Sequence, residues 1–366
     1  MSAVLAPSMT ITSTFAVRLR IRALGLAKVL FGTWLNGAIT IICIALVGWL
    51  CWHAYVWAWR DAVFSGNSAQ CRAAGGACWA FIRAKLAFTI YGVYPVEERW
   101  RAAIAMAVFA AMIGISLVPR FWHARLLAMW IVALALAFML LRGGIAGLEI
   151  VPMRNWSGMI VTIWLAVLSL AFSYPVGLAL ALGRTSELTL IRYLSIGWIE
   201  TVRGVPLISI LFVASIVFPL FMPEGLEVDN LVRAQVAFTA FGSAYLAEVF
   251  RAGLQAIPAG QYEAASALGL GYWRTMLLIV MPQALKLVIP PQVNTFIAIF
   301  KDTTLILVIG VFDFLGTIKA MLSDTDWLGF ATEAYVFAAA IYFVICSGMS
   351  AYSKYLEREL SPETRR

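Results

Sequence analysis

Residues 258–282 read PAGQYEAASALGLGYWRTMLLIVMP and lie between two long apolar runs. Pro258 suits the first turn of a helix, where its missing N–H is not needed, and Gly269 suits the residue just after a helix ends. We therefore predict a short helix between them, with small side chains and one carboxylate, Glu263. A second apolar run over 275–281 is followed by Pro282. Two short helices joined abruptly at a membrane surface would form a protruding element for docking a partner.

The whole chain has the composition of a membrane protein. Its 366 residues are 62% hydrophobic and 13% charged, with a mean hydropathy of +0.88. Such a composition excludes an ordinary soluble domain. The apolar runs are long enough to cross about 30 Å of hydrocarbon. The net charge of +8 indicates membrane topology rather than nucleic-acid binding, because the basic residues occupy short loops and tails.

We count eight apolar spans, so the sequence predicts an all-α polytopic membrane protein. The predicted spans are 34–58, 102–118, 126–141, 157–182, 200–222, 231–250, 283–300 and 331–351.

A change of composition near residue 155 predicts the domain organisation. Residues 1–156 form an N-terminal three-helix membrane module with a polar external loop over 59–101. Residues 157–352 form a five-helix core that carries most of the motifs, and residues 353–366 form a tail.

Charged residues in the loops predict the orientation. The first 30 residues contain Arg18, Arg20, Arg22 and Lys28 and no acid, and the apolar run after them is too long for a cleaved signal peptide. Both termini and the 258–282 stretch are then cytoplasmic. Acidic residues gather in the predicted outer loops: Glu224, Glu227, Asp229, Asp313, Asp324 and Asp326. We expect Asp313 to contact an external partner or to stay in a solvated loop.

Five cysteines are present, and three of them lie in apolar runs. Cys71 and Cys78 lie in the external loop, where an oxidising compartment would allow a disulfide. Two free thiols remain the alternative. The pair has no neighbouring His or Cys, so we predict no metal site.

The 258–282 stretch resembles the EAA loop of binding-protein-dependent ABC importer permeases. The matching residues are Glu263-Ala264-Ala265, Gly269 and, after nine intervening residues, Ile279, then Met281-Pro282 after one more residue, with Met281 where the family usually has Leu. In that family the loop is the coupling helix that sits in a groove of the cytoplasmic ATPase. The resemblance assigns ATPase coupling to Gly260, Glu263, Ala264, Ala265, Gly269 and Pro282.

Residues 200–207 resemble the E-x-x-R-G-x-P-L signature of amino-acid permeases. Glu200 and Arg203 are three residues apart, so we expect them to pair on one helix face. Gly204 and Pro206 then disturb the helix as it enters the membrane. The resemblance implies gating and close packing for these four residues. The alternative is that charged residues and a proline simply mark where a helix enters the membrane.

Ala244, Tyr245, Glu248 and Arg251 resemble the A-Y-x-A-E-x-x-R-x-G run that precedes the EAA loop in the same family. An unpaired carboxylate at mid-membrane costs about 2.5–3.5 kcal/mol. We therefore expect Arg251 to pair with Glu248, as a structural ion pair rather than a substrate contact.

The predicted substrate-binding residues end the seventh span: Asn294, Lys301, Asp302, Thr303 and Thr304. Charged residues in a membrane segment tend to face a cavity or each other. The run resembles the family's K-D-T-S-L, with Thr304 where Ser is usual. Its amide, hydroxyl and charged groups suit the ammonium and carboxylate of an amino acid. A simple pairing of Lys301 with Asp302 is the alternative.

No phosphate-binding loop of the G-x-x-x-x-G-K-[ST] type occurs, because Gly183-Arg184-Thr185 has the wrong spacing and lacks the lysine. We therefore expect no enzymatic activity and no cofactor bound by this chain, with ATP–Mg held by a separate ATPase.

With its N-terminal module, the chain most resembles the long permease subunit of the general L-amino-acid importers of Gram-negative bacteria. The resemblance implies a multi-pass protein of the bacterial inner membrane that couples ATPase motion to alternating access. It also implies an ATPase dimer, a second related permease subunit and a periplasmic amino-acid-binding protein as partners. Two alternatives remain: a secondary transporter driven by an ion gradient, which would show repeated halves, and a non-transporting membrane scaffold.

Overall fold

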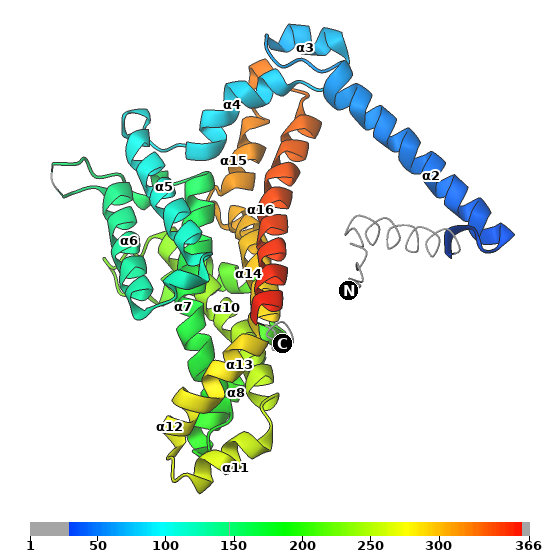
Figure 1. Ribbon diagram of the computed structural model, residues 1–366. Helices are drawn as coiled ribbons and strands as arrows, with labels where there is room; N and C mark the ends of the chain where they lie inside the picture. The colour runs from blue at the N-terminus through cyan, green and yellow to red at the C-terminus, as the bar shows by residue number, and fades with distance from the viewer. Residues whose placement is uncertain (1–28, 146, 361–366) are drawn as a thin grey trace, which may run out of the picture. The chain divides into compact units, whose positions relative to one another are not determined.

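The computed structural model describes residues 29–145 and 147–360, so the basic N-terminal anchor predicted from Arg18, Arg20, Arg22 and Lys28 lies outside the described residues (Figure 1). Within the described part the regular structure is helical, with isolated β-bridges at Val63–Cys78 and Gly158–Asp313. Two compact units divide after Ala80. The α-helices are α2 (Trp34–Tyr55), α3 (Ser68–Ala74), α4 (Trp79–Tyr91), α5 (Arg99–Ser116), α6 (Ala124–Arg142), α7 (Met159–Arg184), α8 (Thr189–Gly204), α9 (Leu207–Phe212), α10 (Asn230–Gln255), α11 (Ala259–Ala267), α12 (Tyr272–Thr275), α13 (Met281–Leu287), α14 (Ile289–Asp302), α15 (Phe314–Met321) and α16 (Ala331–Leu360).

Six helical segments of the described chain are long and apolar enough to cross a membrane. The predicted all-helical, polytopic fold is thus confirmed. α10 has 26 residues and a length of about 39 Å, which also suffices for a span, although it is more polar than the six. The six segments are Trp34–Arg60, Val96–Ser116, Ala124–Arg142, Met159–Arg184, Ile289–Ile309 and Ala331–Glu359.

The fifth predicted span, 200–222, is not one straight helix. Thr189–Gly204 and Leu207–Phe221 meet at a bend of 103°. Pro206 lacks an N–H and disfavours helical backbone in the residue before it, and Val205 is indeed extended. Glu200 and Arg203 therefore belong to α8, before the bend, as the disturbance expected from Gly204 and Pro206 requires.

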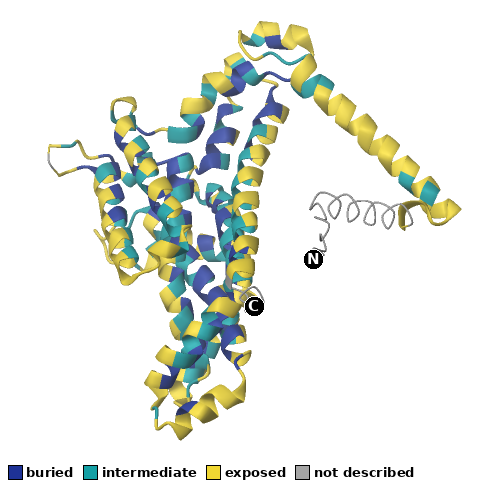
Figure 2. Ribbon diagram, viewed as in Figure 1, coloured by how far each residue is buried: buried dark blue, intermediate teal, exposed yellow. Residues whose placement is uncertain are grey.

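Glycines let α7 and α10 pack closely in the centre of the second unit. A Cβ built on Gly177 of α7 would lie 2.9 Å from both Leu246 Cβ and Ser243 O of α10. Gly242 of α10 likewise faces Ser173 and Ile299. Figure 2 shows buried residues concentrated where these central helices meet and exposed residues on the outward faces. Small residues are what membrane helices use for close contact in the absence of a hydrophobic driving force.

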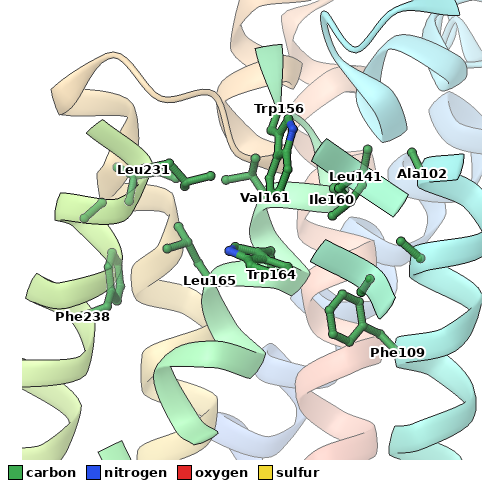
Figure 3. Close-up of a cluster of buried hydrophobic side chains, with 14 of the residues drawn as sticks. Ala102, Phe109, Leu141, Trp156, Ile160, Val161, Trp164, Leu165, Leu231 and Phe238 are labelled. Carbon is green, nitrogen blue, oxygen red and sulfur yellow. The ribbon is translucent and has the colours of Figure 1, made fainter. Parts of the chain in front are cut away.

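Aromatic rings join α5 and α6 to α7. Trp156 and Trp164 meet edge to face, with ring centroids 5.4 Å apart, and Phe109 of α5 contacts Trp164 at 6.2 Å (Figure 3). Phe138 of α6 lies 5.9 Å from Trp164. Residues 81–156 thus pack into the same unit as the core, so the compact units do not follow the predicted division at residue 156. That division stays a prediction about function.

In the first unit, the predicted polar loop contains helix rather than irregular chain. Asn67 and Gln70 form a capping box at the start of α3. Cys71 and Cys78 are joined by a disulfide, with Cα atoms 5.4 Å apart, which is one of the two states that the sequence left open. Ala77 donates its N–H to Trp57 O at 2.8 Å, so the disulfide loop is also tied back to the end of the first span.

We expect Gly177→Ala to lower the melting temperature of the purified protein by several degrees, because the added methyl would overpack a tight interface at a cost of about 1–3 kcal/mol. Thermal unfolding in detergent measures this. Gly114→Ala is the matched control, since a Cβ there meets nothing within 4 Å. Equal melting temperatures for the two variants would contradict the packing argument.

Candidate functional site

A protruding element over residues 258–287, which we call the docking element, is built from α11, α12 and α13 (Figure 1). Pro258 caps α11, and Gly269 ends it with φ +72°. Leu270 N–H donates to Ala265 O at 3.0 Å and Gly269 N–H to Ser266 O at 2.9 Å. This pair of bonds is a Schellman motif, which needs a left-handed residue at the glycine position. The start and the stop predicted from Pro258 and Gly269 are therefore found in the structure.

The predicted coupling residues gather in the docking element, but they do not all face outward. Glu263, Ala264 and Gly260 are exposed, whereas Ala265 is buried and packs the helix onto the rest of the element. Pro282 lies in the first turn of α13. Gln283 Nε2 of α13 donates to Gln261 Oε1 of α11 at 2.9 Å, so the two helices are also joined by side chains. The exposed members of the predicted coupling set are thus carried by two helices that are bonded to each other.

Sequence reasoning missed an apolar surface on the docking element. Leu268, Tyr272 and Trp273 are exposed, with Trp273 showing 63% of its surface. The rings of Tyr272 and Trp273 meet edge to face at 5.2 Å. An aromatic pair three residues after the glycine that ends α11 was the available signal. Large exposed rings close together are typical of a contact surface for another protein.

A cluster of charged residues lies at the ends of α7, α8 and α10, and we call it the Glu248 cluster. Glu248 Oε1 accepts from Arg184 at 2.7 Å. Its Oε2 accepts from Arg251 at 2.8 Å and lies 3.5 Å from Arg203. Arg184 also pairs with Glu200 at 2.9 Å. One carboxylate thus joins three arginines from three helices, and hydrogen bonds to charged groups are the stronger ones.

The pairing differs in part from the sequence prediction. Glu248 does pair with Arg251, but the expected pair between Glu200 and Arg203 is wrong. Each of the two instead reaches across to another helix, Glu200 to Arg184 of α7 and Arg203 to Glu248 of α10. Arg203 also lies 5.5 Å from the ring centre of Tyr245. Sequence reasoning did not place Arg184 in this cluster, although its position at the end of an apolar span was the available signal.

The Glu248 cluster and the docking element are connected through the end of α10. Arg251 donates to Gln255 at 2.8 Å in the last turn of that helix, and α11 begins four residues later at Ala259. Gly253 of α10 packs against α13, where a Cβ would lie 3.0 Å from Ala284 O. Motion of the docking element would therefore reach Glu248 through tightly packed backbone.

The predicted substrate residues lie at the end of α14 and the start of η8 (Thr303–Ile309). Asn294 and Lys301 are exposed and, seven residues apart, share one face of the helix. Asp302 is half-buried. Thr303 and Thr304 donate their hydroxyls to Phe300 O and Lys301 O at 2.8 and 2.9 Å. Thr303 is fully buried, whereas Thr304 is half-buried, so only the Thr304 oxygen is left in reach of a ligand.

The alternative pairing of Lys301 with Asp302 is not what the structure shows. Among the ion pairs of the described residues, none joins these two neighbours. Consecutive residues on a helix point about 100° apart, which keeps the two charged groups from close contact. Lys301 is exposed on the same face as Asn294.

The expectation for Asp313 is wrong, because this residue is buried rather than solvated or open to a partner. It caps α15, accepting from Gly316 N–H at 2.8 Å, and Tyr342 of α16 lies 3.4 Å from its other oxygen. Gly158 N–H donates to the neighbouring Phe312 O at 2.9 Å. Asp313 therefore joins α15 and α16 near the start of α7.

Comparison with known proteins then identifies the class. Residues 173–362 match the family model of the binding-protein-dependent transport system inner membrane component. The chain belongs to this family. It is 46% identical over 346 residues to the inner membrane amino-acid ABC transporter permease protein YhdY of Escherichia coli, covering 91% of this chain and 92% of that one.

Two further relatives agree. The glutamate/glutamine/aspartate/asparagine transport system permease protein BztC of Rhodobacter capsulatus is 36% identical over 409 residues, covering 92% of this chain and 93% of that one. A crystal structure of an amino acid ABC transporter with histidines matches with a TM-score of 0.50 and 32% identity, over 55% of this chain and 92% of that chain. The chain is thus a membrane permease, with the ATPase of such systems on a separate subunit.

We expect Glu248→Gln to lower the melting temperature, since the loss of the carboxylate leaves three arginines at one half-buried place without their shared partner. The change in the free energy of unfolding should be on the order of 1–3 kcal/mol. Thermal unfolding in detergent measures it. Glu263→Gln, at an exposed position of the docking element, should leave the melting temperature unchanged. A similar loss in both variants would show that the cluster does not stabilise the helix ends.

Proposed function

We propose that this chain is the transmembrane permease subunit of an ATP-driven importer for L-amino acids, and that its docking element couples ATPase motion to alternating access. The connected path from exposed Glu263 through α13 and α10 to Glu248 carries the proposal. It offers one mechanical route from a docking surface into the membrane helices. The names of YhdY and BztC support amino acids as the cargo.

The docking element faces the cytoplasm in this proposal, and both termini lie on the same side. The basic loops of the sequence support this orientation. Within the second unit, α11 and α12 lie at one end, and α4 and the start of α16 lie at the opposite end (Figure 1). The latter end would then face the periplasm, where a binding protein delivers the amino acid.

An ATP-binding cassette ATPase dimer is the proposed partner of the docking element, with ATP–Mg bound by the ATPase. Leu268, Tyr272 and Trp273 would fill an apolar groove of that partner, and Glu263 would lie at the rim. A buried aromatic centre surrounded by polar groups is the usual anatomy of such a contact.

A second, related permease subunit would complete the pathway. The exposed face of α14 carries Asn294 and Lys301, which are polar groups that lipid does not satisfy. A second core facing this surface would enclose it and create a polar passage. Asn294, Lys301, Asp302 and Thr304 would then contact the ammonium and carboxylate of the amino acid, whereas the contact predicted for Thr303 is not retained because its side chain is fully buried.

Coupling would proceed through the Glu248 cluster. When ATP closes the ATPase dimer, the docking element moves, and the packing of Gly253 against α13 transfers this movement to α10. Glu248 then draws the ends of α7 and α8 along through Arg184 and Arg203. The bend at Gly204 and Pro206 lets α8 move with the cluster while α9 keeps its place in the membrane, which is the gating role proposed for this motif.

The alternatives lose support. Membership of a binding-protein-dependent family disfavours a transporter driven by an ion gradient. A scaffold without transport would not need polar groups on the exposed face of α14.

We expect Glu263→Ala to abolish ATP-driven amino-acid uptake into proteoliposomes that hold this chain, its sister permease and the ATPase, and to weaken binding of the ATPase. Glu187→Ala is the matched control, because Glu187 is an exposed carboxylate between α7 and α8. Uptake that persists without ATP or the ATPase would overturn the proposed function.

We expect Asp302→Asn to raise the KM of uptake about tenfold or more while ATPase docking stays intact, since the variant keeps the shape but loses the charge for the ammonium. A matched variant, Thr304→Val, should have a smaller effect because its hydroxyl already donates to the backbone. An unchanged KM in Asp302→Asn would remove this residue from the substrate site.

A further inference from the structure

A groove of about 470 Å³ opens between α4, the start of α5 and the end of α15, at the end of the second unit opposite the docking element. We call it the outer groove. Ala84, Ala87 and Phe88 of α4 and Met321 of α15 supply apolar walls, and Ser323 adds a hydroxyl. Its volume lies within the range of about 300–1,000 Å³ that small-molecule sites occupy. The substrate residues of α14 are not part of its lining.

Three charged side chains also line the outer groove: Lys85, Arg99 and Asp324. Lys85 and Asp324 pair with each other, and neither is fully buried. The bonded Lys85 ammonium lowers the pKa of Asp324, so this group is a carboxylate at neutral pH. A mixed-charge groove with apolar walls can hold a small zwitterion more readily than a simple ion.

Arg99 is the surplus charge of the groove. It lies 5.6 Å from the ring centre of Tyr91, and no carboxylate of the described residues forms an ion pair with it. The neighbouring Glu98 is already engaged by Arg101 at 2.7 Å. The Nε of Arg99 is buried without a hydrogen-bond partner among the described atoms. The guanidinium is thus held in place by stacking and keeps donors for an anion.

The charge count selects a ligand class. Two cations and one anion leave the groove with one net positive charge, which matches a molecule with two carboxylates and one ammonium. We propose that the outer groove receives an acidic L-amino acid on the periplasmic face, with its carboxylates on Arg99 and Lys85 and its ammonium on Asp324. This inference rests on the proposed function and adds a reception site apart from the membrane pathway.

When the amino acid binds, Lys85 and Asp324 would exchange each other for groups of the ligand, so no charge would be left unpaired. One ligand carboxylate replaces Asp324 at Lys85, and the ligand ammonium replaces Lys85 at Asp324. The second carboxylate meets Arg99. The walls are held independently of this ion pair, because Phe81 of α4 packs against Trp327 at 5.6 Å and Phe330 at 6.0 Å, and Thr317 donates to Thr89 O at 3.3 Å. The groove can therefore open its ion pair and keep its shape.

The test measures binding of radiolabelled L-glutamate to the assembled permease pair and ATPase, without ATP or binding protein, in phosphatidylcholine nanodiscs that contain no anionic headgroup. We expect saturable binding that Arg99→Gln and Lys85→Gln each weaken at least tenfold, with melting temperatures unchanged. Arg83→Gln is the matched control, because Arg83 is exposed on the same helix outside the groove. L-Glutamine, with one carboxylate fewer, should bind at least tenfold more weakly.

Three results would overturn the proposal: no saturable binding to the native assembly, equal affinity in Arg99→Gln, or binding lost in Asp302→Asn but kept in Arg99→Gln. ATP-driven uptake with the binding protein, measured in parallel, separates the two hypotheses. Continued uptake beside any of these results leaves the proposed function standing and removes only the outer groove. Loss of uptake in native protein would instead count against the proposed function.

Discussion

The carboxylate of Glu248 pairs with three guanidinium groups, and the C-terminal ends of α7, α8 and α10 depend on it. A half-buried carboxylate is stable only while its cationic partners stay close. Because the arginines around Glu248 come from three different helices, the ends of these helices are held together. The same requirement places the start of the docking element, since α11 follows α10 after three residues. Electrostatics at one point therefore positions both the docking surface and the bend beside it.

Within the membrane, close packing holds the same helices together. Gly177 and Gly242 bring the backbones of α7 and α10 together, and the aromatic contacts of Trp164 extend this pair to α5 and α6. Tightly packed helices shift as units rather than deform. A displacement at the Glu248 cluster would therefore be carried along α7 and α10, instead of being lost in loose side chains.

The sequence predicted best those features that neighbouring residues decide on their own, such as where a helix begins and ends. Apolar runs predicted most membrane helices, and Pro258 with Gly269 predicted the start and end of α11 because each residue limits the backbone directly. Partner choice depends on the tertiary arrangement, so the pairing of Glu200 with Arg184 could not be read from spacing. Asp313 was misjudged for the same reason: a carboxylate between two spans looks solvated until α15 and α16 enclose it. The outer groove required three separate segments to meet, which no local pattern signals.

The way α11 ends has a consequence for how such transporters diversify. Its closing bonds join backbone groups, and the one side-chain requirement is a glycine at residue 269. The backbone shape of this helix end thus does not depend on the side chains of Leu268, Tyr272 and Trp273, which project from it. If the docking element contacts the ATPase as proposed, substitutions at these positions would change which ATPase it fits while the backbone that ends α11 stays the same. Under that proposal, the choice of partner would depend on side-chain atoms and the course of the chain on backbone atoms of the same short segment.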